Sequence, residues 1–432
     1  MREKKVMSKK AVLAVALLLM APCSLWAADP EVEELKKRVE ELEKRLEWRV
    51  VTDEPGHKKI HPAHSLYGLS VGGSVTITAH GASGVKGSTP SGEAAISADL
   101  AIESPVGDRG RAVAVFDFQK GAGMQGLPAF FTAPNSNPNG YNADIESFDD
   151  TSLHATQAYY EHELDGGLTV TFGQLDLTGF FDANEYANNE RTQFLANVFV
   201  NNPVIEWGGT DNFYGPGARL SWAASDTVGV TIGAFEGDGD YVDTFDSPFL
   251  MAELDLALSP MGRGGNYRIY YWQRNKRTAA DQPNLADPAD AVLINARNSG
   301  IGVSIDQLLT ETIGIWLRAG VQREKVAQFD KAISGGVDIS GELLGRANDQ
   351  IGIAYSATFI GDGYEDYIRV ADPSFDPGTE HYVEAYYSYA VSHSAAEQGF
   401  HISPDLQYVV NPGGNKGAGD MFIYGIRLQS FF

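Results

Sequence analysis

The sequence has 432 residues, of which 43% are hydrophobic and 11% aromatic, with 47 glycines and a formal net charge of −24. This length exceeds that of an ordinary single globular domain, but it suits one large β-barrel built of many strands and turns. The acidic balance excludes a nucleic-acid-binding protein, which needs a basic surface.

The first 27 residues have the parts of a secretory signal peptide. Arg2 and four lysines form a positive region, an apolar run follows at 11–20, and Ala27 offers a small residue at the cleavage site. The run is too short to cross a membrane as a helix, which needs ~20 residues, and this disfavours an uncleaved anchor. Pro22 before Cys23, the only cysteine, does not suit lipoprotein processing. Cleavage after Ala27 therefore leaves no thiol, and we expect no disulfide, metal or other cofactor.

Residues 28–50 differ from everything that follows them. Apolar residues recur there at alternating steps of three and four, at Val32, Leu35, Val39, Leu42 and Leu46. Charged residues fill almost all the other places. This heptad spacing predicts a short α-helical coiled coil, and the alternative is a lone amphipathic helix on a surface.

Residues 51–66 form a linker in this interpretation. They contain prolines, a glycine and three histidines, His57, His61 and His64. The histidine spacing would suit a metal on one face of a helix, but Pro62 makes a continuous helix unfavourable. A polar linker is therefore the preferred interpretation.

From 67 to 432, apolar residues alternate with polar ones at the period of two that indicates strands with two different faces. The run Val228, Val230 and Ile232 is one example. The polar face carries charges such as Glu103 and Arg318, too many for a dry core. In a transmembrane barrel, by contrast, the apolar face contacts lipid and the polar face lines a wet lumen.

The pattern predicts sixteen strands, at 69–79, 93–103, 110–119, 152–163, 167–175, 215–224, 226–236, 249–259, 264–274, 296–308, 311–323, 334–344, 348–359, 378–392, 397–410 and 419–432. Tight turns alternate with long connections, such as 120–151, 176–214, 275–295 and 360–377. Short turns on one rim and long loops on the other are typical of bacterial outer-membrane barrels. We therefore predict an all-β transmembrane barrel of about 16 antiparallel strands in the outer membrane, in contact with its lipid, with the coiled coil in the periplasm.

Three stretches resemble the carbohydrate-selective porins of the OprB family. They are GQLDLTGFFDANEYANNERTQFLANVFVNNP (173–203), GFHISPDLQYVVNPGGN (399–415) and IRLQSFF (426–432). The resemblance implies a sixteen-stranded barrel that passes small sugars passively. It also implies a loop that folds inward to narrow the lumen, for which 176–214 is the candidate. The N-terminal coiled coil is not part of the family pattern.

Charged and aromatic side chains on the inward face are the candidates for the pore lining and constriction. Arginine and carboxylate groups bond to sugar hydroxyls, and aromatic rings stack on sugar rings. The candidates are Arg219, Arg268, Arg274, Arg318, Arg427, Asp99, Asp117, Glu161, Glu253, Asp255, Trp272 and Trp316 on strands, and Glu190 and Arg191 in the inserted loop. The alternative for each is an ordinary charged wall, and a one-residue slip in register would move a strand's whole set to the other face. Phe180, Phe181 and Phe194 are expected to anchor the loop.

The sequence thus predicts a porin and no enzyme: passive diffusion of small solutes, carbohydrates by resemblance, through a homotrimer. The acidic loop with Asp238, Asp240 and Asp243 is interpreted as surface acidity, because it lacks the distal glutamate of a calcium loop. One alternative is a structural outer-membrane protein whose coiled coil contacts the cell wall. Another is a porin for a different solute, such as a siderophore.

Overall fold

The computed structural model describes residues 64–66, 69–84, 93–121, 127, 151–207, 214–237, 248–274, 297–393 and 398–432. The predicted signal peptide (1–27), the coiled coil (28–50), most of the linker and the acidic loop at 238–243 lie outside these residues. The last three linker residues are described. They form the short strand β1 (His64–Leu66), which pairs with the start of β2.

Sixteen longer strands follow within the described residues. They are β2 (Leu69–Ser83), β3 (Glu93–Val106), β4 (Gly110–Lys120), β5 (Thr151–Leu164), β6 (Leu168–Asp176), β7 (Tyr214–Ser225), β8 (Val228–Phe235), β9 (Phe249–Leu258), β10 (Gly265–Arg274), β11 (Asn298–Leu308), β12 (Ile313–Gln322), β13 (Phe329–Ser340), β14 (Gln350–Ile360), β15 (Glu380–His393), β16 (Gly399–Val410) and β17 (Met421–Phe431). Helices α3 (Asn197–Val200) and α4 (Asp362–Ala371) lie in connections, together with 3-10 turns at Leu177–Gly179, Pro260–Gly262, Glu324–Val326, Gly341–Leu344 and Pro412–Gly414.

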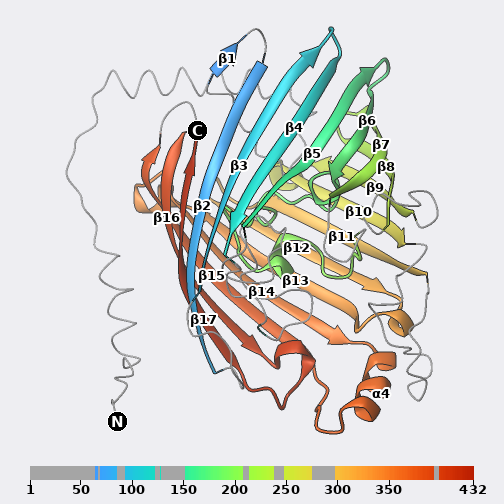
Figure 1. Cartoon of the computed structure of the whole chain (residues 1–432), viewed down its shortest axis with the longest axis vertical. Helices are drawn as coiled ribbons and strands as arrows, with labels where there is room; N and C mark the ends of the chain where they lie inside the picture. Colours follow the sequence, from blue (N-terminus) through green and yellow to red (C-terminus); the bar gives the residue numbers. More distant parts are fainter. Residues whose placement is uncertain are drawn as a thin grey trace. The chain divides into compact units, whose positions relative to one another are not determined.

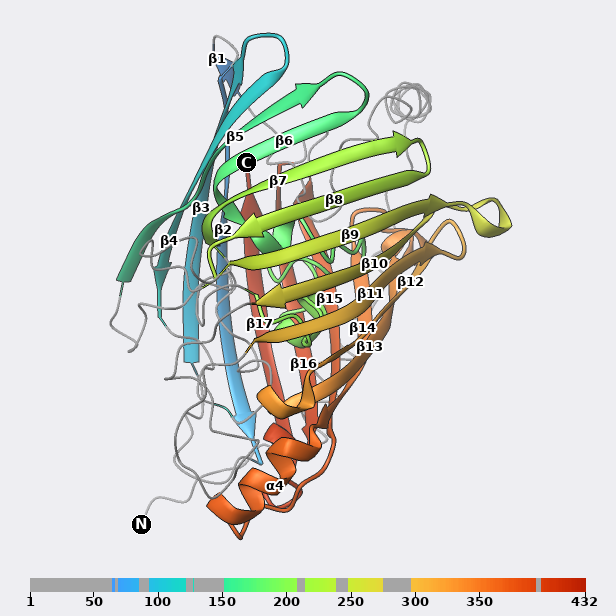
Figure 2. The same cartoon turned by 90° about the vertical axis from the view of Figure 1, so that its right-hand side faces the viewer.

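Each of these strands pairs antiparallel with the next, and the last one returns to the first. β17 pairs with β2 along its whole length, with Arg427 opposite Thr78. The sheet therefore closes into a sixteen-stranded antiparallel barrel (Figures 1 and 2), which confirms the predicted fold class. In the described residues, no helix is long and apolar enough to cross a membrane.

The largest difference from the predicted strands is at β13. The strand was expected at 334–344, but it begins at Phe329 and ends at Ser340. The Ser340 side chain accepts a hydrogen bond from the Glu342 backbone N–H at 3.3 Å, and Gly345 ends the following turn with a φ of 72°. The turn chemistry of these two residues stops the strand before the apolar pattern does. The loop expected at 360–377 also contains helix α4.

The two faces of the wall differ as the alternation predicts. Bulky aliphatic side chains such as Ile232, Ile269 and Ile301 stand on the outer face with 50, 51 and 54% of their surface exposed. Their sequence neighbours Thr231 and Arg268 point to the other face and are buried. An apolar outer face around a polar inner one is the arrangement of a transmembrane barrel.

The last strand closes the barrel with an outward aromatic residue. The backbones of Phe432 and Gly73 exchange two hydrogen bonds of 3.0 Å. The Phe432 ring covers Gly73 so closely that a Cβ there would lie 2.8 Å from the ring. Phe432 thus shares the outer face with Phe422, Tyr424 and Ile426, which alternate in the same strand.

Candidate functional site

The candidate site is built by the chain between β6 and β7. Its described part, residues 177–207, is called the inserted segment here. Side chains from β3, β9, β10, β11, β12, β15 and β17 all contact it, so it lies inside the ring of strands, as Figure 2 also shows. This confirms that 176–214 supplies a loop that folds into the lumen.

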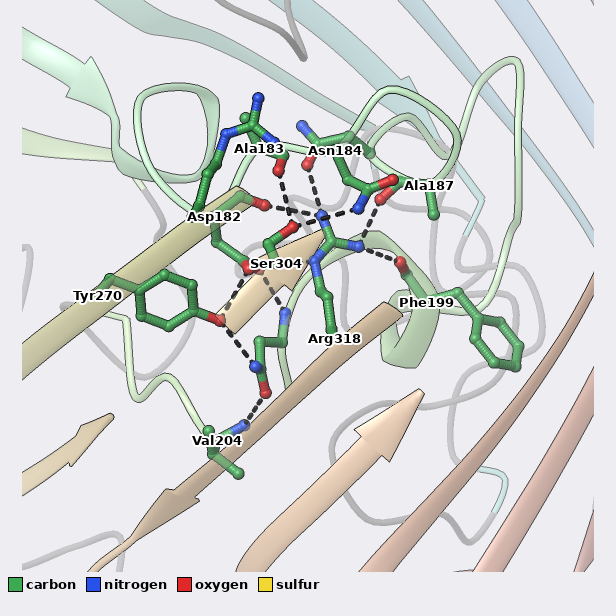
Figure 3. Close-up of polar contacts among 12 residues, drawn as sticks. Asp182, Ala183, Asn184, Ala187, Phe199, Val204, Tyr270, Ser304 and Arg318 are labelled. Atoms are coloured by element: carbon green, nitrogen blue, oxygen red, sulfur yellow. Dashed lines mark hydrogen bonds and ion pairs between the residues drawn. The ribbon is translucent and has the colours of Figure 1, made fainter. Parts of the chain in front are cut away.

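The strongest anchor of the inserted segment is Arg318 on β12, which is fully buried. Its Nε donates to Asp182 Oδ1 at 3.1 Å, and its Nη1 donates to the carbonyl oxygens of Ala187 and Phe199 at 2.5 and 2.7 Å. Its Nη2 donates to the Asp182 carbonyl at 2.8 Å and to Asn188 Oδ1 at 2.9 Å. Figure 3 shows the guanidinium between Asp182, Ala187 and Phe199. One wall side chain therefore holds four separate points of the segment with all five of its donors.

Asp182 is the segment's own half of this anchor. Its backbone is left-handed, with a φ of 57°, which is uncommon for a residue other than glycine. Its carboxylate accepts from Tyr270 at 2.8 Å and from the Asn202 N–H at 2.6 Å, and its own N–H donates to Glu253 at 2.8 Å. These hydrogen bonds hold both the backbone and the side chain of Asp182, so the residue can keep its strained backbone conformation.

A second anchor holds the middle of the segment, between the points that Arg318 holds at Asn188 and Phe199. Glu384 on β15 accepts from the backbone N–H groups of Leu195 and Ala196 at 2.5 and 2.9 Å. Arg427 on β17 donates through Nη1 to the carbonyl oxygens of Glu190 and Gln193, both at 2.8 Å. Backbone groups that have no partner within the segment are thus satisfied by charged wall residues.

Aromatic packing holds the segment in addition to the two anchors. Phe194 lies 5.7 Å from Trp316 and 5.1 Å from Tyr386 between ring centroids, and Phe199 lies 5.7 Å from Tyr382. A second cluster joins Phe180 and Phe181 to the wall around Phe235 and Trp272. Full burial of a phenylalanine side chain stabilises the folded protein by about 1.5–3 kcal/mol relative to leaving the side chain exposed. The expected anchoring role of Phe180, Phe181 and Phe194 agrees with these contacts.

The segment also reaches β3 through Arg191. Its Nη2 donates to Asp99 Oδ1 at 2.9 Å, its Nε lies 2.8 Å from Asp99 Oδ2, and its Nη1 donates to Glu190 at 3.2 Å. Burial would lower the pKa of Arg191, but Asp99 and Glu190 raise it above its ordinary value, so Arg191 stays charged. Burial raises the pKa of Glu190; Arg191 opposes this and Asp99 adds to it. Unlike the two wall anchors, this group keeps part of its surface in contact with water.

The wall at β4–β7 carries a row of alternating charges. Arg111, Glu161, Thr171 and Arg219 stand directly opposite one another on four successive strands. Arg111 Nε and Arg219 Nη2 donate to the two oxygens of Glu161 at 2.8 and 2.9 Å. The Arg219 guanidinium lies 4.0 Å from the centre of the Phe180 ring, so the segment covers this end of the row.

The predicted site residues therefore form three groups. Arg318, Arg427, Trp316, Glu253 and Arg274 contact the inserted segment directly or through its neighbours, Arg274 by an ion pair of 3.0 Å with Glu206. Arg268 joins Asp255 and Asp306 at 2.9 and 2.8 Å in the wall, Asp117 accepts from Gln119, and Trp272 is fully buried beside Phe249. Asp99, Glu190, Arg191, Glu161 and Arg219 make the contacts given above. We propose that the first group positions the segment rather than touching solute.

Two residues important for this geometry were missed from the sequence. Arg111 shares its face with Val113 and Val115, so the polar alternation is absent where it stands. Asp182 lies in a connection, where the period of two gives no information. Its acidic side chain after two phenylalanines was the only available indication.

Comparison with known families agrees with this architecture. The model of the family described as "Carbohydrate-selective porin, OprB family" matches residues 107–432. The chain belongs to the OprB family. The match covers the barrel from the turn before β4 onward, including the inserted segment and both of its anchors.

Two solved structures have the same fold. The high-pH structure of Pseudomonas putida OprB matches with a TM-score of 0.66 and 17% identity over 84% of this chain and 94% of that one. The outer membrane channel DcaP of Acinetobacter baumannii matches with a TM-score of 0.53 and 16% identity over 85% and 99%. At these identities the likeness concerns the fold alone.

A sequence relative is also known from Aquifex aeolicus (strain VF5). This uncharacterized protein is 27% identical over 220 residues, which are 50% of this chain and 58% of the relative. The matched region thus spans less than two thirds of that protein.

Proposed function

We propose that this protein is an outer-membrane channel for the passive diffusion of small polar solutes, with carbohydrates of monosaccharide size as the preferred class. The observation that carries the proposal is the inserted segment, which is held inside a closed barrel by two buried charged anchors. A segment fixed in this way narrows the lumen permanently, so the opening left beside it sets the size limit.

The water-accessible group on this segment suits a hydroxylated solute. Arg191 offers donors, and Glu190 and Asp99 offer acceptors, close to one another. A sugar hydroxyl both donates and accepts, so it can bond to each of these groups. The membership of the chain in a family of carbohydrate-selective porins supports the same solute class.

Liposome swelling tests this function. Proteoliposomes should swell rapidly in a monosaccharide, more slowly in a disaccharide and very slowly in a trisaccharide. Replacing Arg191 by glutamine should reduce the difference in swelling rate between a monosaccharide and a polyethylene glycol of the same size. Only the sugar would lose hydrogen bonds to the charged side chain. A folded barrel that gives no swelling in any sugar would contradict the proposal.

Acidification is expected to make the channel less cation-selective. The pKa of Glu190 lies above its ordinary value of 4.5, so protonation begins at a higher pH than for a free glutamate, and it removes one negative charge beside Arg191. Reversal potentials in a salt gradient should shift toward anions as the pH falls from 7 to 5. The shift should be absent in Glu190→Gln; the same shift in that variant would assign it to another group.

Two finer expectations are part of this proposal. The barrel is proposed to assemble as a homotrimer, and its coiled coil (28–50) to extend into the periplasm and contact the cell wall. Crosslinking of the purified full-length protein addresses the first. Cosedimentation with isolated cell wall, with and without residues 28–50, addresses the second.

A further inference from the structure

The wall of the barrel near the short-turn rim carries a polar site that lies away from the inserted segment's charged group. Arg111 is the second residue of β4, and Glu103 stands three residues before the end of β3. Both lie next to the turn at 107–109. Short turns of such barrels face the periplasm, so these residues stand at the inner exit of the lumen.

The orientation of both side chains is fixed by register. Arg191 of the inserted segment reaches Asp99, so the face of β3 that carries Asp99 is the lumen face. Glu103 lies four residues further along the same strand and shares that face. On β4, Asp117 pairs with Asp99, and Arg111 has the same parity as Asp117.

The exposure of the side chains increases along the charged row of β4–β7, from Arg219 at its buried end to Arg111 and the neighbouring Glu103 at the exit. The side chains of Arg219 and Glu161 are 3 and 11% exposed, whereas those of Arg111 and Glu103 are 35 and 49% exposed. The buried end is tightly bonded, but Arg111 Nη1 and Glu103 are 3.5 Å apart, at the limit of a hydrogen bond. Within the described residues, Arg111 Nη2 has no hydrogen-bond partner. The accessible end therefore keeps donors and an acceptor available for a solute.

Charge and shape define which solute this end would hold. The positive charges of Arg111 and Arg219 balance the negative charges of Glu161 and Glu103. A free ion of either sign is therefore attracted only weakly to this part of the wall. A half-exposed ion pair contributes about 0–1 kcal/mol, so a hydroxyl group can replace it at small cost. Tyr159 lies on the same face opposite Val113 and packs edge-on against Phe180 at 5.8 Å, which adds a ring beside the polar groups.

We propose that Arg111 and Glu103, with the ring of Tyr159, form a second station for a neutral polyhydroxylated solute at the periplasmic exit of the channel. This inference rests on the proposed function, because the station would bind a solute that has already diffused past the inserted segment. Asp99 and Glu103 are four strand residues apart, about 13 Å at 3.3 Å per residue, so one monosaccharide cannot contact both sites at once. The solute would leave the segment, bind the exit station and then enter the periplasm.

Glucose block of single-channel current tests the station. Arg111→Gln and Glu103→Gln should each weaken the block by about three- to tenfold, the range expected for loss of one ordinary net hydrogen bond. Block by a polyethylene glycol of similar size should not change. Arg109→Gln is the matched control. Arg109 lies in the turn at 107–109 and pairs with Asp165 in the turn between β5 and β6, and these side chains are 53 and 90% exposed. Each variant is first checked for the heat-modifiable mobility of a folded barrel.

A double variant separates the station from the inserted segment's charged group. Sites this far apart are expected to act additively, so Arg111→Gln combined with Arg191→Gln should show the product of the two single effects. Normal glucose block in both Arg111→Gln and Glu103→Gln would overturn the station and leave the proposed channel standing. Absence of block in the unaltered protein would overturn both.

Discussion

Replacing Arg318 by leucine is expected to release the inserted segment and raise the single-channel conductance severalfold. The change removes all five hydrogen bonds that this side chain donates and leaves Asp182 buried without its cation. Breaking one partner of a buried pair costs about 3–5 kcal/mol. The barrel itself should remain, because its strands pair independently of the segment. Sugar block should fall together with the rise in conductance.

Arg268→Leu is the matched control for this prediction. Arg268 is also a buried arginine, but its ion pairs are with Asp255 and Asp306 of the wall. It should lower the stability of the barrel with a much smaller change in conductance. If Arg318→Leu folds and keeps the conductance and sugar block of the unaltered channel, the anchor is not what keeps the lumen narrow.

Replacing Glu384 by alanine is expected to loosen the middle of the segment, at Leu195 and Ala196, and make the open current noisy. The Leu195 and Ala196 N–H groups would lose their acceptor inside the barrel, at a cost of about 1–3 kcal/mol for each buried group left unpaired. Arg427 and the aromatic cluster still hold this part of the segment, so the result should be fluctuation between conductance levels rather than full release. Current noise at constant voltage measures this directly.

Two variants on the same strand complete the test of Glu384. Glu384→Gln keeps one oxygen acceptor and should give an intermediate noise. Glu380→Ala removes a buried carboxylate that accepts from Gly413, in the connection between β16 and β17, and should leave the noise unchanged. Equal noise in Glu380→Ala and Glu384→Ala would show that any loss of wall charge has this effect.

The fold was predictable because the barrel obeys a local rule. Alternating residues such as Val228, Val230 and Ile232 identify both a strand and the face that meets lipid, and tight turns identify the short rim. The prediction failed at β13, where Ser340 and Gly345 end the strand by side-chain and backbone chemistry that the alternation does not include. Helix α4 was missed because the strand pattern carries no information about structure within a long connection.

The candidate site was predictable only as a set of inward residues. The alternation of side chains along the strands placed Arg318 and Arg427 on the lumen face. It did not indicate which groups these arginines bind. Their partners are remote in sequence: 136 residues separate Arg318 from Asp182, and 237 separate Arg427 from Glu190. Such pairings depend on how a connection folds back across the barrel, and the local alternation of polar and apolar residues does not contain that information. We propose that one group of this expected charged wall, which includes Arg318 and Arg427, supports the inserted segment.

The fixed segment is proposed to leave a permanent, sugar-sized opening through the outer membrane. Single-channel recording of the purified full-length protein in a planar bilayer, with glucose added in steps, tests it most directly. We expect a steady open conductance without voltage or ligand activation. We also expect a concentration-dependent reduction by glucose that is larger than the reduction by an equal concentration of a trisaccharide. A folded, heat-modifiable barrel that passes no current would contradict this proposal. So would a barrel whose current does not change when glucose is added.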